Sequence, residues 1–153
     1  MGTSETWGSI HSECSHELSK EAIRIRTEVF DNEQGFTGLV DEVDGKSDTL
    51  HVMLYDDEEA VGTCRLFPEE PGSATYIVGR FAVIKSRRGE RLGKKLLISA
   101  ERAISRAGGH KVKLAAQKRA QGFYEHEHYV PIGEEFLEQD YPHIWMEKLL
   151  TRE

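Results

Sequence analysis

The sequence predicts a single α/β (α+β) domain, with one mixed and mostly antiparallel central sheet that carries helices on both faces. The length of 153 residues fits one domain that can bury a sizeable core. Two apolar runs, residues 50–55 and 60–67, are separated by a few turn-forming residues, which indicates an antiparallel hairpin. Farther along, an apolar strand at residues 74–84 leads into a helical pattern at 89–107 and a strand at 112–116. That order is typical of a β-α-β crossover between parallel strands.

The N-terminal third combines one short strand with one amphipathic helix. Residues 7–11 are expected to form the strand, and a helical pattern begins at residue 17. Its apolar residues recur at steps of three and four: Leu18, Ala22, Ile25 and Val29, with Ile23 and Phe30 beside them. Gly35 ends this helix, and residues 35–45 are expected to form a loop rich in acidic residues.

The second half supplies the longest helix and the last strands. One face of the helix at residues 89–107 is apolar, at Leu92, Leu96, Leu97, Ala100, Ala103, Ile104 and Ala107. Two glycines, at positions 108 and 109, stop this helix. A short helix is expected at residues 121–127, and the final strands at residues 129–132 and 144–149.

Composition excludes several classes of function. The chain carries 20 Lys and Arg against 27 Asp and Glu, and a net charge of −7 would repel a nucleic-acid backbone. No run approaches the ~18 apolar residues of a membrane span, and no secretory leader pattern opens the chain. Cys14 and Cys64 stand alone, which suits a reducing cytoplasm. Residues 1–6 fit both a loose N-myristoylation pattern and an ordinary polar terminus.

The junction before the longest helix points to a phosphate-bearing ligand. Gly89 and Gly93 lie in a loop rich in arginine and lysine that opens the helix at residues 89–107. The first backbone N–H groups of a helix lack intrahelical partners, and the positive end of the helix dipole favours phosphate there. The spacing does not match a P-loop, because only three residues separate the two glycines and Lys95 stands where that motif needs a hydroxyl. A GxGxxG dinucleotide pattern is also missing.

Together, several motifs resemble those of the GNAT-superfamily N-acetyltransferases, and most closely the ElaA/YjcF-like branch. They are Phe81-Ala82-Val83, Arg88-Gly89-Glu90-Arg91-Leu92-Gly93, Gln117, Phe123-Tyr124, Arg26-Thr27-Glu28-Val29-Phe30, Glu33-Gln34-Gly35, Asp41-Glu42-Val43-Asp44-Gly45 and Pro142-His143-Ile144. The resemblance covers nearly the whole chain as one domain, residues 1–153, and implies a GNAT-like sheet. Two departures are mild: the family loop pattern places Ser86 and Arg91 at its first and last positions, and His128-Tyr129 stands where Gly-Phe is usual.

The resemblance implies that acetyl-CoA lies along the strand that contains Phe81, Ala82 and Val83. The pyrophosphate of the coenzyme would then contact backbone amides of Arg88, Gly89, Glu90, Arg91, Leu92, Gly93 and Lys94. A backbone N–H near Ala82 and Val83 would polarise the thioester carbonyl, and Gln117 would bind the pantetheine arm or simply cap a helix. Tyr124 resembles the family tyrosine that protonates the departing sulfur, although packing alone would also explain it.

The resemblance leaves the general base and the acceptor open. Some family members carry a Glu or His on the central strand, but Val78-Gly79-Arg80 offers no base here. The candidates are Glu33, Asp44 and His143, unless water relays the proton. Arg65 and Arg80 are candidates to bind a substrate carboxylate, or to pair with Glu28 or Asp44 instead.

The resulting hypothesis is a cytoplasmic N-acetyltransferase that uses acetyl-CoA and acts on a primary amine of a small molecule or a protein. The alternative is a non-catalytic module that binds acyl-CoA as a sensor. Neither a nucleic-acid partner nor a membrane is expected, and homodimers are common in the family. No metal is expected, because residues 126–128 lack the second histidine of HExxH, whose place Val130 takes.

Overall fold

The computed structural model describes residues 5–151 and contains one eight-stranded sheet of order β1-β2-β3-β4-β5-β6-β8-β7. The strands are β1 (Thr6–Trp7), β2 (Ile10–Ser15), β3 (Leu50–Asp56), β4 (Glu59–Pro68), β5 (Thr75–Val83), β6 (Lys111–Gln117), β7 (Val130–Glu138) and β8 (Tyr141–Leu149). The α-helices are α1 (Lys20–Arg26), α2 (Leu92–Arg106) and α3 (Gln121–His126). Every neighbouring pair of strands is antiparallel except β5 with β6, which α2 connects. The predicted fold class is therefore confirmed.

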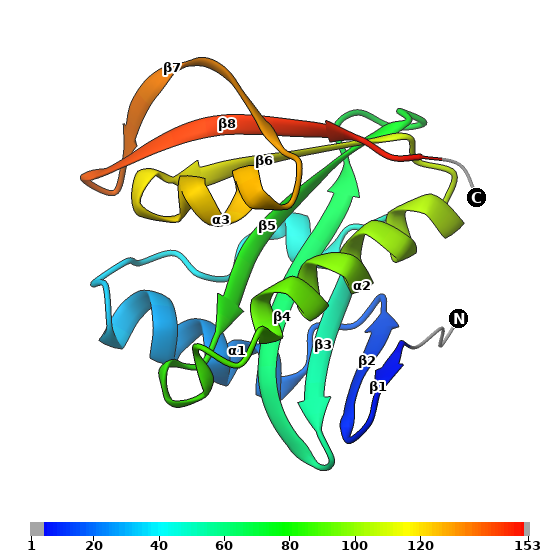
Figure 1. Cartoon of the computed structure of the whole chain (residues 1–153), viewed down its shortest axis with the longest axis vertical. Helices are drawn as coiled ribbons and strands as arrows, with labels where there is room; N and C mark the ends of the chain where they lie inside the picture. The colour runs from blue at the N-terminus through cyan, green and yellow to red at the C-terminus, as the bar shows by residue number, and fades with distance from the viewer. Residues whose placement is uncertain (1–4, 152–153) are drawn as a thin grey trace.

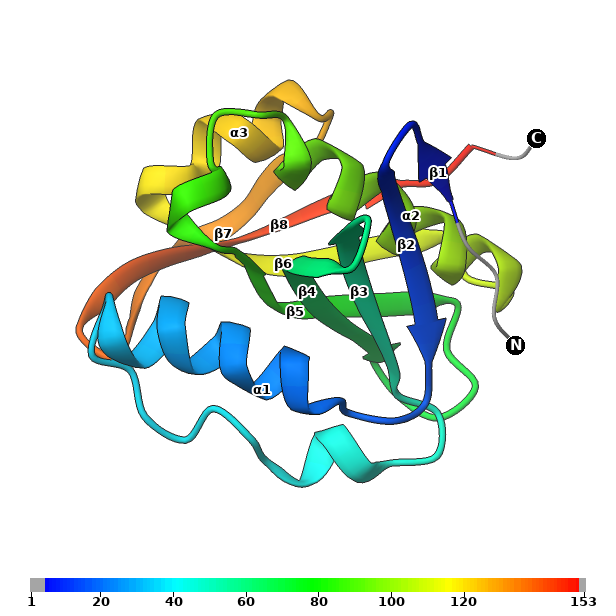
Figure 2. The ribbon, with the colours of Figure 1, turned by 90° about the horizontal axis from the view of Figure 1, so that it is seen from below.

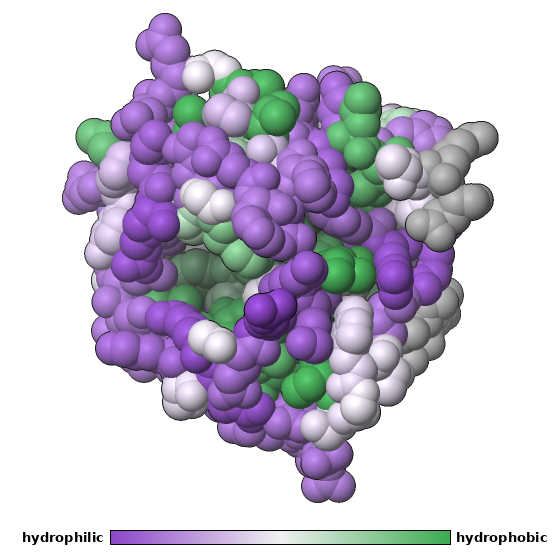
Figure 3. All heavy atoms as spheres, in the orientation of Figure 1, coloured by the Kyte–Doolittle hydropathy of each residue, from purple (hydrophilic) through white to green (hydrophobic). Residues whose placement is uncertain are grey.

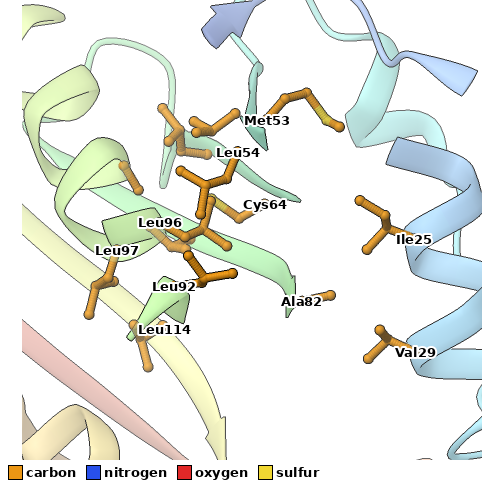
Figure 4. Close-up of a cluster of buried hydrophobic side chains, with 14 of the residues drawn as sticks. Ile25, Val29, Met53, Leu54, Cys64, Ala82, Leu92, Leu96, Leu97 and Leu114 are labelled. Atoms are coloured by element: carbon orange, nitrogen blue, oxygen red, sulfur yellow. The ribbon is translucent and has the colours of Figure 1, made fainter. Parts of the chain in front are cut away.

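The helices lie on both faces of the sheet. Helix α1 covers one face, whereas α2 and α3 lie on the other (Figures 1 and 2). Strand β5 is the centre of this arrangement: Ile25 and Val29 approach Ala82 from the side of α1, and Leu92 and Leu96 approach from α2 (Figure 4). All five of these side chains are less than 5% exposed, so the core fixes β5 from both faces.

The N-terminal region differs in detail from the expectation. The single strand expected at residues 7–11 is two strands, β1 and β2, joined by a turn at Gly8 with a φ of 63°. The helix begins at Lys20, where the Ser19 hydroxyl accepts a hydrogen bond from the N–H of Ala22. It continues as a π-helical segment, Thr27–Asn32, and ends before Gly35, whose φ is 77°.

The longest helix starts later than the sequence predicts. It begins at Leu92 instead of residue 89, because Gly89 and Arg91 have left-handed backbones with φ of 87° and 64°. Residues in that conformation cannot continue a right-handed helix. The segment before the helix is therefore a loop, preceded by one 3-10 turn at Lys85–Arg87.

The C-terminal strands are longer than predicted. Strands β7 and β8 have nine residues each and meet in a tight turn at Gln139 and Asp140, with φ of 50° and 68°. The register of the pair shifts between Ile132 and Phe136, where a run of glycine and glutamates forms an irregularity. That irregular stretch breaks the period-two alternation, so the sequence pattern hides the second half of β7.

Three further expectations concern membrane-spanning helices, the two cysteines and the N-terminal myristoylation pattern. No helix among residues 5–151 is long and apolar enough to cross a membrane. Cys14 and Cys64 are both free. The myristoylation pattern lies outside the described residues.

Candidate active site

A cavity of about 630 Å³ opens where β5 and β6 separate. The two strands pair only over Thr75–Val78 and Lys111–Leu114, and beyond this point each follows its own direction. Residues 79–83 of β5 and residues 115–117 of β6 consequently do not pair with each other. The segment after α1, the loop before α2, helix α3 and the tip of the β7–β8 hairpin complete the walls. Figure 3 shows the hollow on this face, with hydrophobic residues in its depth and hydrophilic residues around it.

The loop before α2 presents a run of backbone donors to the cavity. None of the hydrogen bonds within residues 5–151 uses the backbone N–H groups of residues 89–94, whereas Lys95 already donates to the carbonyl oxygen of Arg91. Of these six residues, all except Glu90 line the cavity. The left-handed residues Gly89 and Arg91 turn the chain so that it can present consecutive amides to one anion. A polyanionic group such as a pyrophosphate fits this loop.

The charges around the cavity are mostly positive, although the protein as a whole is acidic. Its lining includes Arg80, Arg87, Arg88, Arg91, Lys94 and Arg119, against Glu127 and Glu138. Two of these arginines are neutralised internally. Arg87 pairs with Asp56 (2.6 Å), Glu59 and Glu90. Arg88 pairs with Glu33 at 2.6 Å and donates to the carbonyl oxygen of Val83.

Three further cations of this lining stay available to a ligand. No ion pair to Arg91, Lys94 or Arg119 exists among the described residues, and all three line the cavity. Arg119 makes one side-chain contact, donating to the Gln117 oxygen at 3.1 Å. An anionic ligand in the cavity would therefore meet uncompensated positive charge.

Tyr124 places a neutral phenol beside β5. It packs edge-on against the rings of Phe81, Phe123 and Tyr129, and lines the cavity. No acceptor among the described residues receives a hydrogen bond from its hydroxyl. Burial raises the pKa of Tyr124 well above its ordinary value, so the hydroxyl keeps its proton at neutral pH. A group that is protonated, uncommitted and next to the cavity can serve as a proton donor.

His143 is the candidate base that lies at the cavity. Its Nδ1 lies 2.8 Å from the carbonyl oxygen of Tyr141, which can only accept, so Nδ1 carries the proton in the neutral ring. Nε2 is then left with a lone pair and has no donor among the described residues. In the register of β6 and β8, His143 is directly opposite Gln117, so both side chains share one face of the sheet.

Glu33 and Asp44, the other two candidate bases, lie outside the cavity lining. The Arg88 guanidinium lowers the pKa of Glu33, although partial burial opposes this effect. Asp44 is 6% exposed and receives two hydrogen bonds from Arg26, at 2.9 and 3.0 Å. Burial alone would raise the pKa of Asp44, but Arg26 and a backbone N–H reverse the effect and lower it strongly. Both carboxylates are committed to ion pairs and are weak proton acceptors.

Of the two arginines predicted to bind a substrate carboxylate, only one lines the cavity. Arg65 is 5% exposed, pairs with Asp41 and Asp44, and does not line the cavity. Arg80 lines it, at a position where the register of β4 and β5 shifts and its own backbone has a φ of 50°. A left-handed arginine inside a strand is strained, and this bulge directs its side chain toward the loop at residues 38–41.

Sequence reasoning missed several residues of the site. Phe30 and Phe36 stack with their ring centroids 6.0 Å apart and line the end of the cavity away from the α2 loop. Gln139 lies more than 100 residues later and contacts the same region through Thr37. Phe30 belongs to the apolar stripe of the predicted helix, but no signal in the sequence brings Gln139 to this wall.

The histidine-rich end of α3 does not form a metal centre among the described residues. No group of three or more His, Cys, Asp or Glu side chains within residues 5–151 is placed to hold a metal ion. His126 and Glu127 line the cavity, and the His126 ring approaches the Glu127 carboxylate at 3.3 Å.

The sequence of this chain is similar to those of known acetyltransferases. A sequence model of the Acetyltransferase (GNAT) domain family matches residues 14–150. The uncharacterized N-acetyltransferase YjcF of Bacillus subtilis is 31% identical over 137 residues, which cover 88% of this chain and 94% of that protein. The protein ElaA of Escherichia coli is 28% identical over 138 residues, with 89% and 90% covered.

Solved structures give the same result. The crystal structure of an acyl-CoA N-acyltransferase from Pseudomonas aeruginosa superposes with a TM-score of 0.81 at 30% identity, covering 92% of this chain and 99% of that one. The crystal structure of Escherichia coli ElaA also gives 0.81, at 26% identity, with 91% and 99% covered.

Proposed function

The chain belongs to the GNAT acetyltransferase family of acyl-CoA-dependent acyltransferases, and from that premise we propose a reaction in which it transfers the acetyl group of acetyl-CoA directly to a primary amine. Both substrates would occupy the cavity at once, in a ternary complex. The observation that carries the proposal is the cavity itself, which joins a loop of free amides to an uncommitted phenol and an oriented imidazole.

The residues at one end of the cavity fit coenzyme A. The unpaired N–H groups of residues 89–94 would bind the pyrophosphate, and the cations Arg91, Lys94 and Arg119 would compensate its charge. The free edges of residues 79–83 and Gln117 would hold the amide-bearing arm of the coenzyme. Acetyl-CoA supplies an acetyl group activated as a thioester. A backbone N–H near Ala82 and Val83 would stabilise negative charge on the carbonyl oxygen.

His143 would prepare the acceptor. An amine reaches the cavity mostly as an ammonium ion, which has no lone pair for attack. Nε2 of His143 would accept one of its protons, while the Tyr141 carbonyl oxygen holds Nδ1–H and stabilises the resulting imidazolium. The free amine then forms the new C–N bond.

Tyr124 would complete the transfer. As the C–S bond breaks, the electron pair remains on the sulfur, and the phenol donates its proton to that thiolate. The tyrosinate would regain a proton from solvent or from the acylated nitrogen. Because burial raises the pKa of Tyr124, the phenol carries its proton at neutral pH and can donate it to the sulfur.

The test uses binding and turnover separately. Calorimetry should detect coenzyme A binding to the protein, and a thiol reagent should detect free coenzyme released from acetyl-CoA in the presence of an amine panel. The Tyr124→Phe variant should bind coenzyme A as the parent does, but turn over about 100-fold more slowly. Equal losses of both would assign Tyr124 to packing.

A non-catalytic acyl-CoA sensor is the alternative that this experiment separates. Such a module would bind the coenzyme and gain thermal stability, but would release no thiol with any amine. Binding without release would therefore reject the proposed enzyme reaction, while absence of binding would reject both functions.

A further inference from the structure

The end of the cavity away from the α2 loop has features that the acyl-transfer reaction alone does not explain. Its apolar wall consists of Phe30, Phe36 and Leu39, and Tyr141 packs edge-on against Phe36 with centroids 5.0 Å apart. Arg80 lies beside this wall, since its Nε donates to the carbonyl oxygen of Leu39 at 3.1 Å. A cation next to an aromatic pocket can recognise an anion attached to an apolar body.

The buried arginines beside Arg80, together with Arg80 itself, outnumber the carboxylates that pair with them. Arg26, Arg65 and Arg80 share only two carboxylates, Asp41 and Asp44. Three guanidinium groups, which stay charged in proteins, against two carboxylates leave one positive charge. The neighbouring imidazole, His51, is buried, with a lowered pKa, and adds no charge at neutral pH.

The surplus charge reaches the cavity through Arg80. Arg65 and Arg26 are at most 5% exposed and do not line the cavity, whereas Arg80 does. Its Nε and Nη2 are used by Leu39, Gly38 and Asp41. No acceptor among the described residues takes a hydrogen bond from Nη1, which therefore keeps two donors for a ligand.

The same end also offers acceptors for an ammonium group. The side-chain oxygen of Gln34 is buried and has no donor among the described residues, although Gln34 lines the cavity. Glu138 adds the anionic charge of this end, and His143 supplies its lone pair. Positive and negative groups on one apolar wall complement a molecule that carries both charges itself.

The rim of this end is closed by hydrogen bonds between distant segments. The Gln139 side chain accepts from the N–H of Thr37 at 2.9 Å and donates to its carbonyl oxygen at 2.8 Å. The Tyr141 hydroxyl donates to the carbonyl oxygen of Gln34 at 3.2 Å. These bonds join the tip of the β7–β8 hairpin to the segment after α1, and Figure 2 shows the two side by side. An extended polypeptide could pass between these two segments only if these bonds were broken.

We infer that the acceptor is a small zwitterionic amine with an apolar body, such as a free amino acid, whose carboxylate binds Arg80 Nη1 and whose amino group faces His143. This inference rests on the proposed function and names its acceptor class. The surplus charge and the free donors of Arg80 select the carboxylate, and the closed rim selects against peptides and proteins.

The test compares amines that differ only in the carboxylate. Thiol release from acetyl-CoA is measured with the common amino acids, with their decarboxylated counterparts such as 2-phenylethylamine, and with peptides that have a free amino terminus. We expect kcat/KM for the best amino acid to exceed that of its decarboxylated counterpart by about 30-fold, because a charge-assisted pair is lost. Peptides should be poorer still.

A matched pair of variants connects this preference to Arg80. Arg80→Gln should reduce the ratio of the two kcat/KM values to below about threefold, whereas a purely structural role would lower both values equally. Arg102→Gln, an exposed arginine of α2 that pairs with Glu5, should keep the parent ratio. Calorimetry with coenzyme A shows whether each variant is folded.

The outcomes separate the two proposals. Equal turnover of amino acids and their decarboxylated counterparts, or faster turnover of peptides, would overturn the acceptor class and leave the acetyltransferase reaction standing. Coenzyme binding without thiol release from any member of the panel would reject the reaction itself, and the acceptor class with it.

Discussion

The two ends of the cavity are built in different ways. The end that we propose binds the coenzyme consists of consecutive residues, 89–94, whose backbone N–H groups have no partner among the described residues. The end that we propose binds the acceptor consists of side chains from segments far apart, such as Phe36, Arg80, Gln139 and His143. The first end depends on backbone N–H groups, which every residue except proline carries. The second end depends on the identity of individual side chains.

With these proposed roles, substitutions should change acceptor binding more readily than coenzyme binding. Backbone N–H groups persist when side chains change, provided that the loop keeps its left-handed residues. Ser86 and Arg91 depart from the usual loop pattern without removing a single amide. At the acceptor end, a single substitution removes the donor or the ring that a substrate would contact.

The largest expected effect is at the acceptor end. His143→Asn should lower kcat about 1,000-fold, because a positioned general base contributes about 10²–10⁴. Affinity for coenzyme A, measured by calorimetry, should be unchanged. Rates within tenfold of the parent would show that water or another group removes the proton, and would contradict the assignment of His143 as the base.

Gly89→Asp tests the coenzyme end by adding both strain and negative charge. The backbone φ of 87° disfavours a side chain, although no atom lies within 4 Å of the position that a Cβ would occupy. We expect coenzyme affinity to fall about 100-fold, roughly 3 kcal/mol, by calorimetry. Gly89→Asn is the matched control, because Asn tolerates this conformation and adds no charge. Equal losses in both variants would mean that strain, not repulsion of the pyrophosphate, weakens binding.

Asp44→Asn tests how the acceptor end is held together. Arg26 would lose its charged partner, and the free energy of unfolding should fall by about 2 kcal/mol at neutral pH. The pKa of Asp44 is lower in the folded protein than in the unfolded chain, so its contribution is present above about pH 4 and is lost as pH falls below it. Denaturant unfolding from pH 7 to pH 3 should therefore show a weaker pH dependence in the variant. The same dependence in both proteins would contradict this role.

Glu33→Gln should have the smallest effect, because this carboxylate lies outside the cavity lining and is paired with Arg88. Its pair with Arg88 is partly exposed, and such pairs contribute about 0.2–1 kcal/mol. Turnover should stay within about fivefold of the parent in the thiol-release assay. A loss as large as that of His143→Asn would restore Glu33 as the base.

The same contrast separates what the sequence could predict from what it could not. The α2 loop was predictable because its glycines, its cations and the helix that follows are contiguous. The helices and the β5-α2-β6 crossover were predictable from their apolar periodicity. The start of α2 was not, since the φ of Arg91 depends on the folded loop.

Contacts between distant segments were also beyond prediction. The pairing of Gln139 with Thr37 needs the full register of β7 and β8, half of which the glycine and glutamate run obscures. Our proposal of His143 over Glu33 and Asp44 as the base depends on knowing which carboxylates are bound to arginines. Sequence alone treats all three as available.

The short pairing between β5 and β6 has a consequence for cooperativity. Only four residue pairs, from Thr75 with Lys111 to Val78 with Leu114, form the seam between the halves of the sheet. A coenzyme arm bound between the separated parts of β5 and β6 would bridge the two strands in place of the backbone pairing that they lack. When the coenzyme binds, amide hydrogen exchange should then slow in both β5 and β6. Coenzyme binding would thus stabilise the contact between the two halves of the sheet.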